Sequence, residues 1–160
     1  MARTDWDRTS QRALPVWLPV VVAALIVARL ISSRYEVKSP VDMVRWTPIA
    51  TAERMSMATK KPIFYEFSAD WCGPCHQMED EVFRDPELAA LINQKLIAVK
   101  VVDRQRETGR NSAEVAKLEV QFGVRAFPTI VIVRPGGGEP EKVEGYGGKE
   151  QFEALLRGIS

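Results

Sequence analysis

Residues 63–75, IFYEFSADWCGPC, place the chain's only two cysteines shortly after a run of apolar residues. Positions 63–67 are apolar almost throughout, which predicts a buried, central β-strand rather than a strand with one side in water. The proline between Cys72 and Cys75 is typical of the first turn of a helix. The sequence therefore predicts a strand, a turn and a helix, with both thiols at the turn.

The spacing of the two cysteines, placed at a predicted strand-to-helix turn, indicates redox chemistry, although the spacing alone does not decide it. Thiols two residues apart can close a small disulfide ring and open it again. A helix N-terminus presents unpaired N–H groups and the positive end of its dipole, and both stabilise a thiolate. Cys72 is therefore expected to be the exposed nucleophile. Cys75, one turn further inside, is expected to resolve the mixed disulfide.

His76, the only histidine, leaves two other interpretations open. Cys-x-x-Cys-His is also an attachment pattern for c-type haem, with the histidine as proximal ligand. A zinc site needs four ligands, and two cysteines with one histidine leave one missing. Haem attachment usually lies among helices, not after a buried strand. We therefore favour a surface position for His76, with no metal and no cofactor beyond a redox-active Cys72–Cys75 disulfide.

Composition excludes some partners and indicates the organisation of the chain. The 160 residues are 46% apolar and 27% charged, which is typical of one folded domain with a short appendage. The net charge of +1 gives no electrostatic argument for nucleic-acid binding. No nucleic-acid partner is therefore expected.

An uncharged stretch near the N-terminus predicts a membrane anchor. Residues 13–28 carry no charge, and with Arg29 snorkelling the apolar run reaches residue 31. As a helix it would be about 28 Å long, close to the hydrocarbon thickness of a bilayer. The predicted parts are a tail (1–12), a transmembrane signal-anchor helix (13–31), a linker (32–43) and a folded domain (44–160). A cleaved signal peptide and a buried core helix are the alternatives.

Arginines on both sides of the predicted anchor leave its orientation open. A short N-terminal tail most simply stays in the cytoplasm, which puts the domain on the extracytoplasmic side. We therefore expect a single-pass protein of a bacterial cytoplasmic (inner) membrane, with its domain facing the periplasm. A cytoplasm-facing tethered domain is the alternative.

The rest of the domain alternates helices and strands. Helices are predicted from the Thr47-Pro48 cap to about Thr59, from Pro74, after the Asp85-Pro86 restart, between Ser112 and Gly123, and over 149–156. Further strands are predicted at 96–102, 129–133 and 142–146, with a charged loop at 103–111. This order predicts an α/β domain with a parallel core and an antiparallel edge.

With WCGPC after a buried strand and Phe127-Pro128-Thr129 before a later one, the chain resembles the thioredoxin superfamily from Trp46 to Ile159. The pattern KPIFYEFSADWCGPC…EDEVFRDPEL is most similar to the C-terminal thioredoxin-like domain of the membrane thiol reductases called DsbD. The resemblance implies a thioredoxin-like fold, a central mixed sheet flanked by helices, preceded here by the predicted anchor.

The resemblance also implies roles for two acids. Glu66 lies where the thioredoxin pattern has a buried aspartate, and a buried carboxyl with a raised pKa can exchange a proton with Cys75. Glu79, four residues after Cys75, matches a second acid of the DsbD-like pattern, which would keep the nearby cysteine protonated until a partner docks. The alternatives are that Glu66 points to solvent at a strand end and that Glu79 is a solvated helix charge.

The substrate groove implied by the resemblance combines two segments: Trp71, Gly73, Pro74, Phe127 and Pro128. The superfamily has a cis-proline loop there, in which the backbone of the residue before the proline pairs with the partner peptide. The Gly-Pro dipeptide between the cysteines is that of reducing thioredoxins, and it implies a reductant. The arginines of the charged loop are expected to be solvated, with a partner surface as the alternative: Arg104, Arg106 and Arg110.

The predicted function is a membrane-anchored thiol:disulfide oxidoreductase that reduces protein disulfides through Cys72 and Cys75. Its implied partners are disulfide-bonded proteins and a membrane electron donor of the DsbD or CcdA type. Cytochrome c maturation is one use that the resemblance suggests. A non-catalytic binding or chaperone module with a thioredoxin fold is the alternative.

Overall fold

The computed structural model describes residues 17–32 and 41–159, which belong to two separate units. The first unit contributes one helix, α1 (Trp17–Ser32). Within the described ranges, no helix is both long enough and apolar enough to cross a membrane. The predicted tail, the first residues of the predicted anchor and most of the predicted linker lie outside these ranges.

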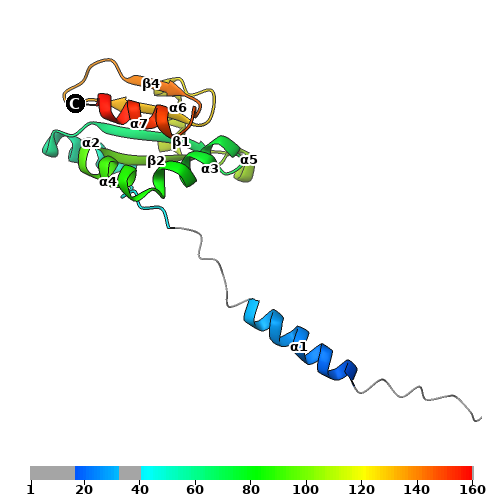
Figure 1. Cartoon of the computed structure of the whole chain (residues 1–160). Coiled ribbons are helices and arrows are strands. Elements are labelled where there is room, and N and C mark those ends of the chain that lie inside the picture. Colours follow the sequence, from blue (N-terminus) through cyan, green and yellow to red (C-terminus); the bar gives the residue numbers. More distant parts are fainter. Residues whose placement is uncertain (1–16, 33–40, 160) are drawn as a thin grey trace, which may run out of the picture. The chain divides into compact units, whose positions relative to one another are not determined.

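The second unit is an α/β domain whose elements follow the predicted alternation (Figure 1). In chain order they are α2 (Ile49–Thr59), β1 (Ile63–Ala69), α3 (Gly73–Met78), η1 (Glu79–Phe83), α4 (Pro86–Lys95), β2 (Ile97–Asp103), α5 (Gln105–Thr108), α6 (Ala113–Phe122), β3 (Thr129–Val133), β4 (Glu141–Glu144) and α7 (Lys149–Gly158).

The four strands form one mixed sheet in the order β2-β1-β3-β4, so β1 is central as predicted. Strand β1 pairs parallel with β2, antiparallel with β3, and β3 pairs antiparallel with β4. The predicted parallel core is thus limited to one pair. The reason is that Thr129, the first residue of β3, pairs with Phe67 near the end of β1, where β2 also stops. The chain therefore re-enters the sheet at the end it left, and β3 runs back.

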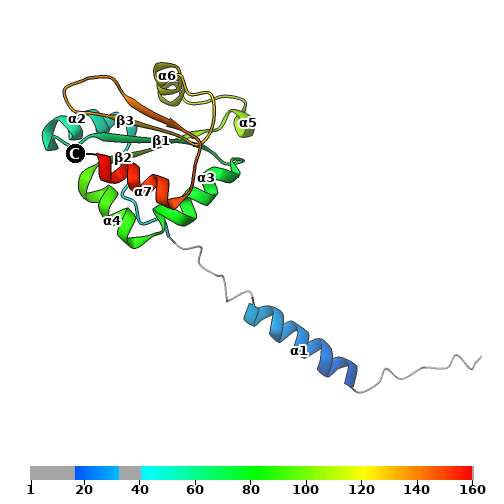
Figure 2. The ribbon, with the colours of Figure 1, turned by 45° about the horizontal axis from the view of Figure 1, so that its top comes forward.

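Helices cover both faces of the sheet (Figure 2). Alternate residues of a strand point to opposite faces. Phe64 packs with Met78 of α3, Phe83 of η1 and residues of α4 and α7, whereas Phe67 packs on the other face with residues of α2 and α6. Glu66 has the same parity as Phe64. Its carboxyl is therefore directed to the layer that contains α3, where the cysteines lie.

Two helix starts test the predicted caps. Asp85 caps α4, because its Oδ1 accepts the backbone N–H groups of Glu87 and Leu88, both at 2.9 Å. The predicted Thr47 cap is wrong: Pro48 occupies the cap position of α2 and makes no side-chain capping bond. The backbone N–H of Thr47 instead donates to the carbonyl of Ala98 at 2.7 Å. That contact ties the start of the domain to β2.

The charged loop after β2 contains a short helix that the sequence did not predict. Helix α5 is one turn long, and Gly109 ends it with a φ of 77°. Such a positive φ favours glycine because it has no Cβ. Asn111 holds the loop closed by accepting the backbone N–H of Arg104 at 2.7 Å. The loop is therefore an ordered structure beside the turn that carries the cysteines.

Candidate active site

Cys72 and Cys75 form a disulfide at the N-terminus of α3, with their Cα atoms 5.3 Å apart. Cys72 is the cap residue of the helix, and its Sγ accepts the backbone N–H of Cys75 at 3.2 Å. One N–H group of the helix N-terminus, that of Cys75, thus points at the Cys72 sulfur. In the reduced pair this arrangement stabilises a thiolate at Cys72.

The disulfide itself is covered, and the residues around it are exposed. Cys72 is 2% exposed and Cys75 5%. The prediction that Cys72 is exposed is therefore wrong for this disulfide form. The reason is packing, since the pair forms an apolar cluster with Ala69 and Phe127 lies against it. Trp71, in contrast, is 45% exposed, so a partner first meets the rim of the site.

The two predicted segments of the substrate groove lie together. The rings of Trp71 and Phe127 meet edge to face, with centroids 5.8 Å apart. The Phe127–Pro128 peptide bond is cis, as the resemblance implied. Because β3 starts beside the end of β1, residues 127–128 are brought next to the cysteines. Gly73 and Pro74, the first two residues of α3, are exposed between the two cysteines, so they are accessible to a partner.

Glu66 is a buried acid, only 1% exposed, so the alternative that it points to solvent is wrong. The hydroxyl of Ser68 donates to its Oε2 at 3.0 Å. Burial raises the pKa of Glu66 to about 7; the Lys100 charge and the Ser68 hydrogen bond lower it, and Glu79 and Asp42 raise it. Burial dominates because a charge loses its hydration there. Glu66 can therefore gain or lose a proton near neutral pH.

A small cavity connects this acid to the cysteine pair. Its volume is about 50 Å³, and its lining includes Glu66, Cys75, Glu79 and Lys100. A cavity of that size with several polar groups is large enough to hold water. Proton exchange between the Cys75 thiol and the Glu66 carboxyl therefore has a short route.

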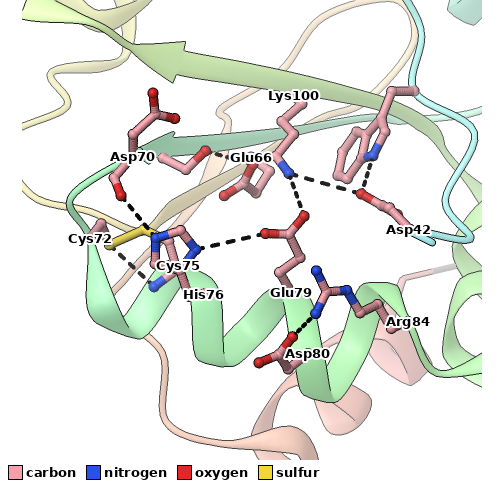
Figure 3. A network of polar contacts seen from close by, with 12 residues as sticks. Asp42, Glu66, Asp70, Cys72, Cys75, His76, Glu79, Asp80, Arg84 and Lys100 are labelled. Carbon is pink, nitrogen blue, oxygen red and sulfur yellow. Dashed lines mark hydrogen bonds and ion pairs between the residues drawn. A yellow bond between two sulfur atoms is a disulfide. The ribbon is translucent and has the colours of Figure 1, made fainter. Parts of the chain in front are cut away.

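Glu79 is the first residue of η1, a π-helical turn that continues α3. The backbone N–H of Arg84 donates to the Glu79 carbonyl at 3.1 Å, which is the i to i+5 bond of such a turn. Its side-chain Oε1 accepts from the Lys100 ammonium at 3.2 Å, and Oε2 lies 3.9 Å from Nδ1 of His76 (Figure 3). Glu79 is therefore an ion-paired group beside the cavity and not a solvated charge.

Lys100 was missed in the sequence, although a signal existed. It is the only charged residue in the run 97–102, just as Glu66 is the only charged residue in 63–67. The two are direct register partners in the parallel pairing of β1 with β2. A lone charge in each of two buried strands predicts such a pair. Asp42, which lies 3.9 Å from the Lys100 ammonium, had no comparable signal.

The charged loop also contacts the site. The guanidinium of Arg106 lies 3.7 Å from the centroid of the Trp71 ring, and Arg104 pairs with Asp70 at 3.2 Å. Both arginines are exposed, as expected, but each also contacts a residue beside the cysteines. Arg106 stacks on an aromatic residue directly beside Cys72, which is a cation–π contact.

His76 is exposed, as predicted, and its Nε2 lies 2.9 Å from the carbonyl oxygen of Asp70. Across the residues that the structure describes, no three His, Cys, Asp or Glu side chains are grouped so that they could hold a metal ion. The polar groups around the cysteines are instead a carboxyl, an ion pair and helix N–H groups. These groups can exchange protons and stabilise a thiolate.

The fold and the site define a thioredoxin-like redox domain. Residues 49–160 match the family described as thioredoxin-like domain, and the chain belongs to that family. It is 29% identical over 162 residues to the thiol:disulfide interchange protein DsbD of Salmonella typhimurium, covering 92% of this chain and 28% of that protein. It is 35% identical over 101 residues to a thioredoxin of Alicyclobacillus acidocaldarius, covering 62% and 82%.

Solved structures show the same fold. DsbH oxidoreductase superposes with a TM-score of 0.62 at 22% identity, covering 72% of this chain and 83% of that one. The C-terminal domain of Neisseria meningitidis DsbD in the reduced form gives 0.55 at 20% identity, covering 69% and 92%. The predicted resemblance to thioredoxins and DsbD-type domains is confirmed. The chain spans little more than a quarter of the length of the Salmonella DsbD it matches.

Proposed function

We propose that this chain is a thiol:disulfide oxidoreductase that reduces disulfides in partner proteins. One observation carries the proposal: the Cys72–Cys75 pair lies at a helix N-terminus, and Cys75 shares a cavity with the buried acid Glu66. A nucleophilic thiolate needs the helix N-terminus, and a resolving thiol needs a proton acceptor. The start of α3 provides the first, and Glu66 of β1, in the cavity beside Cys75, provides the second.

The first step is attack on the partner. In the reduced protein the Cys72 thiolate attacks one sulfur of the partner's disulfide. The Cys72–partner S–S bond forms, the partner's own S–S bond breaks, and its second sulfur leaves as a thiolate that takes a proton from water. The exposed Trp71 and the Phe127–Pro128 segment provide the surface against which the partner peptide lies.

The second step releases the partner. The Cys75 thiol gives its proton to Glu66, and the resulting thiolate attacks the Cys72 sulfur. The Cys72–Cys75 bond forms, the mixed disulfide breaks, and the remaining partner sulfur leaves and is protonated. Two electrons have then passed from the cysteine pair to the partner. With its pKa raised to about 7, Glu66 is an effective proton acceptor at neutral pH.

Insulin reduction tests the proposal. With dithiothreitol as electron source, the protein is expected to accelerate insulin precipitation, and Cys72→Ser is expected to abolish the acceleration. Cys75→Ser should still attack but should stall as a mixed disulfide. If the wild-type protein and Cys72→Ser behave alike, catalysis by this pair is refuted. A thioredoxin-fold binding module would then be the better assignment.

The direction and the partners belong to the same proposal. The Gly-Pro dipeptide between the cysteines supports reduction rather than oxidation of partners. The similarity to DsbD supports a membrane electron donor of the DsbD or CcdA type. Cys75→Ser expressed in cells should trap natural substrates as mixed disulfides. An apocytochrome c among them would support a role in cytochrome c maturation, and a set of oxidised electron carriers alone would contradict one.

The proposed location is the extracytoplasmic side of a bacterial cytoplasmic membrane, with residues 13–31 as anchor. The support is the uncharged sequence 13–28. The full chain is expected to stay in the membrane pellet after alkaline carbonate extraction and to be digested by protease added to spheroplasts. Release by carbonate would refute anchoring. Protection from the protease in spheroplasts, with digestion after lysis, would instead support the cytoplasm-facing alternative.

A further inference from the structure

Residues 41–47, which we call the strap, lie against the same layer as the cysteines. The backbone N–H of Met43 donates to the carbonyl of Phe83 at 2.9 Å, and Trp46 forms a parallel β-bridge with Ala98. The Trp46 ring also meets the Phe83 ring edge to face, with centroids 5.0 Å apart. The strap is therefore fixed to both β2 and η1.

Both carboxylate oxygens of Asp42 in the strap are engaged. Oδ1 accepts the backbone N–H of Val44 at 2.9 Å, and Oδ2 accepts the indole N–H of Trp46 at 2.6 Å. The same Oδ2 lies 3.9 Å from the ammonium of Lys100 (Figure 3). Two donors thus hold one negative charge at a set place beside Lys100.

Lys100 contacts two carboxyl groups and is the register partner of a third acid. Its ammonium donates to Glu79 at 3.2 Å, lies near Asp42, and belongs to the residue paired with Glu66 across the sheet. It also lies 5.5 Å from the centroid of the Trp46 ring and 6.0 Å from that of Phe83. These contacts draw the ammonium toward the strap and η1. Glu66 is left with the Ser68 hydroxyl as its hydrogen-bond donor within the described residues.

We propose that Asp42, held by the Trp46 indole, is a positioning residue that draws Lys100 away from Glu66 and so keeps a proton on Glu66. The inference rests on the proposed role of Glu66 as proton acceptor. The charged groups that act on Glu66 are Lys100 from β2, Glu79 from η1 and Asp42 from the strap, with His76 of α3 beyond Glu79. Asp70 and Cys75 line the same cavity, and Cys75 carries no proton while it is in the disulfide. Neutralising Asp42 removes a negative charge and frees Lys100. Both changes favour the Glu66 carboxylate.

The direct test is the titration of Glu66 in the full chain, followed by NMR with ¹³C-labelled glutamate carboxyls. Asp42→Asn should lower the Glu66 midpoint by about half a pH unit, the effect of one charge across a partly solvated site. Asparagine still offers an oxygen to the same donors, so the fold is expected to persist. Asp80→Asn is the matched control, because Asp80 pairs with Arg84 and is exposed (Figure 3). In Asp80→Asn the titration midpoint of Glu66 should equal that of the wild type.

Trp46→Phe supplies a second, independent test. Phenylalanine keeps an aromatic ring against Phe83 but removes the donor to Asp42. The Glu66 midpoint should fall, by less than in Asp42→Asn. Because Trp46 acts through Asp42, the double variant should shift no further than Asp42→Asn alone. Additive shifts, an unmoved midpoint in folded Asp42→Asn, or an equal shift in Asp80→Asn would each overturn the proposal.

This titration does not use catalysis, so the two proposals fail separately. A lowered midpoint in Asp42→Asn combined with no insulin reduction by the wild type would uphold the positioning role and refute the proposed function. An active wild-type protein together with an unmoved Glu66 midpoint in Asp42→Asn would uphold the proposed function and refute the positioning role. A pH profile of the second step of the reaction then links the two. In Asp42→Asn the pH profile of the second step should move to lower pH by the same amount as the Glu66 midpoint.

Discussion

Glu66 and Lys100 are register partners in neighbouring parallel strands, yet the Lys100 ammonium donates to Glu79, at 3.2 Å. The buried acid is therefore left without a directly bonded cation among the described residues. Opposite charges nearby lower the pKa of a carboxyl, and burial raises it. For Glu66 burial dominates, and its pKa rises to about 7. If Glu66 accepts the Cys75 proton as proposed, we expect the second step of the reaction to depend on pH near neutrality.

Glu66→Gln should change how stability depends on pH. The folded-state pKa is raised from 4.5 to about 7, so between these values the folded protein binds more protons than the unfolded chain. The free energy of unfolding therefore falls as pH rises through this window, by about 3 kcal/mol in total. Glu66→Gln should lose this slope. Urea unfolding of the oxidised protein across the window measures it.

The control for that measurement is Glu114→Gln, which neutralises an exposed glutamate in the first turn of α6. It should keep the wild-type slope. If Glu66→Gln keeps the slope as well, the pH dependence belongs to other groups and the pKa of Glu66 is not raised.

Lys100→Met should slow the second step of disulfide reduction at neutral pH. The methionine keeps much of the apolar stem but removes the charge that lowers the Glu66 pKa, so that pKa rises further. A larger fraction of Glu66 is then protonated and cannot accept the Cys75 proton. We expect about a three- to tenfold slower decay of the mixed disulfide at pH 7, since one pKa unit changes a proton equilibrium tenfold. Single-turnover quenching with a peptide disulfide measures it.

Raising the pH should restore the Lys100→Met rate, because Glu66 then loses its proton. Lys117→Met removes an exposed lysine of α6, on the other face of the sheet, and should behave as the wild type. A defect in Lys100→Met that is equal at all pH values would show that Lys100 acts through packing and not through the Glu66 proton.

Asp85→Ala should destabilise the domain without changing its redox chemistry. Asp85 caps α4 through two backbone N–H groups, and loss of such a cap costs about 1 kcal/mol. Its Oδ2 also accepts from Lys149 of α7 at 2.6 Å. Urea unfolding should show a lower midpoint with an unchanged insulin-reduction rate per folded molecule. A rate that falls more than the folded fraction would place Asp85 in the site.

Much of the fold was predictable because its signals are local. A continuous apolar run predicted the central strand β1, and the Asp85-Pro86 pair predicted the start of α4. The direction of β3 was not local information. It depends on where the chain returns after α6, and the cysteine-bearing turn occupies the same end of the sheet. The alternation of helices and strands along the sequence does not predict at which end of the sheet the chain begins β3.

The site divides in the same way. The cysteines were visible as a motif, and Glu66 was visible as a charge in an apolar strand. Lys100 could have been found in the same way as Glu66, because it too is the lone charge in an apolar strand. Asp42 and Arg106 lie in segments without periodicity. Each reaches the site only through a tertiary contact, Asp42 with Lys100 and Arg106 with Trp71. Their roles could not be inferred before the strap and the charged loop were placed.

Arg106→Ala should weaken partner binding more than it slows catalysis. The Arg106 guanidinium lies 3.7 Å from the centroid of the Trp71 ring and holds this exposed residue beside Cys72. A cation–π contact at an exposed site contributes about 0.5–1 kcal/mol, so KM for a peptide disulfide should rise about two- to fivefold with little change in kcat. Arg106→Lys should recover part of the loss, because its ammonium can still lie over the ring. Arg110→Ala removes an arginine from the same loop and should leave KM at the wild-type value. An equal rise in Arg110→Ala would mean that the loop's overall charge, and not the stacking on Trp71, sets the affinity.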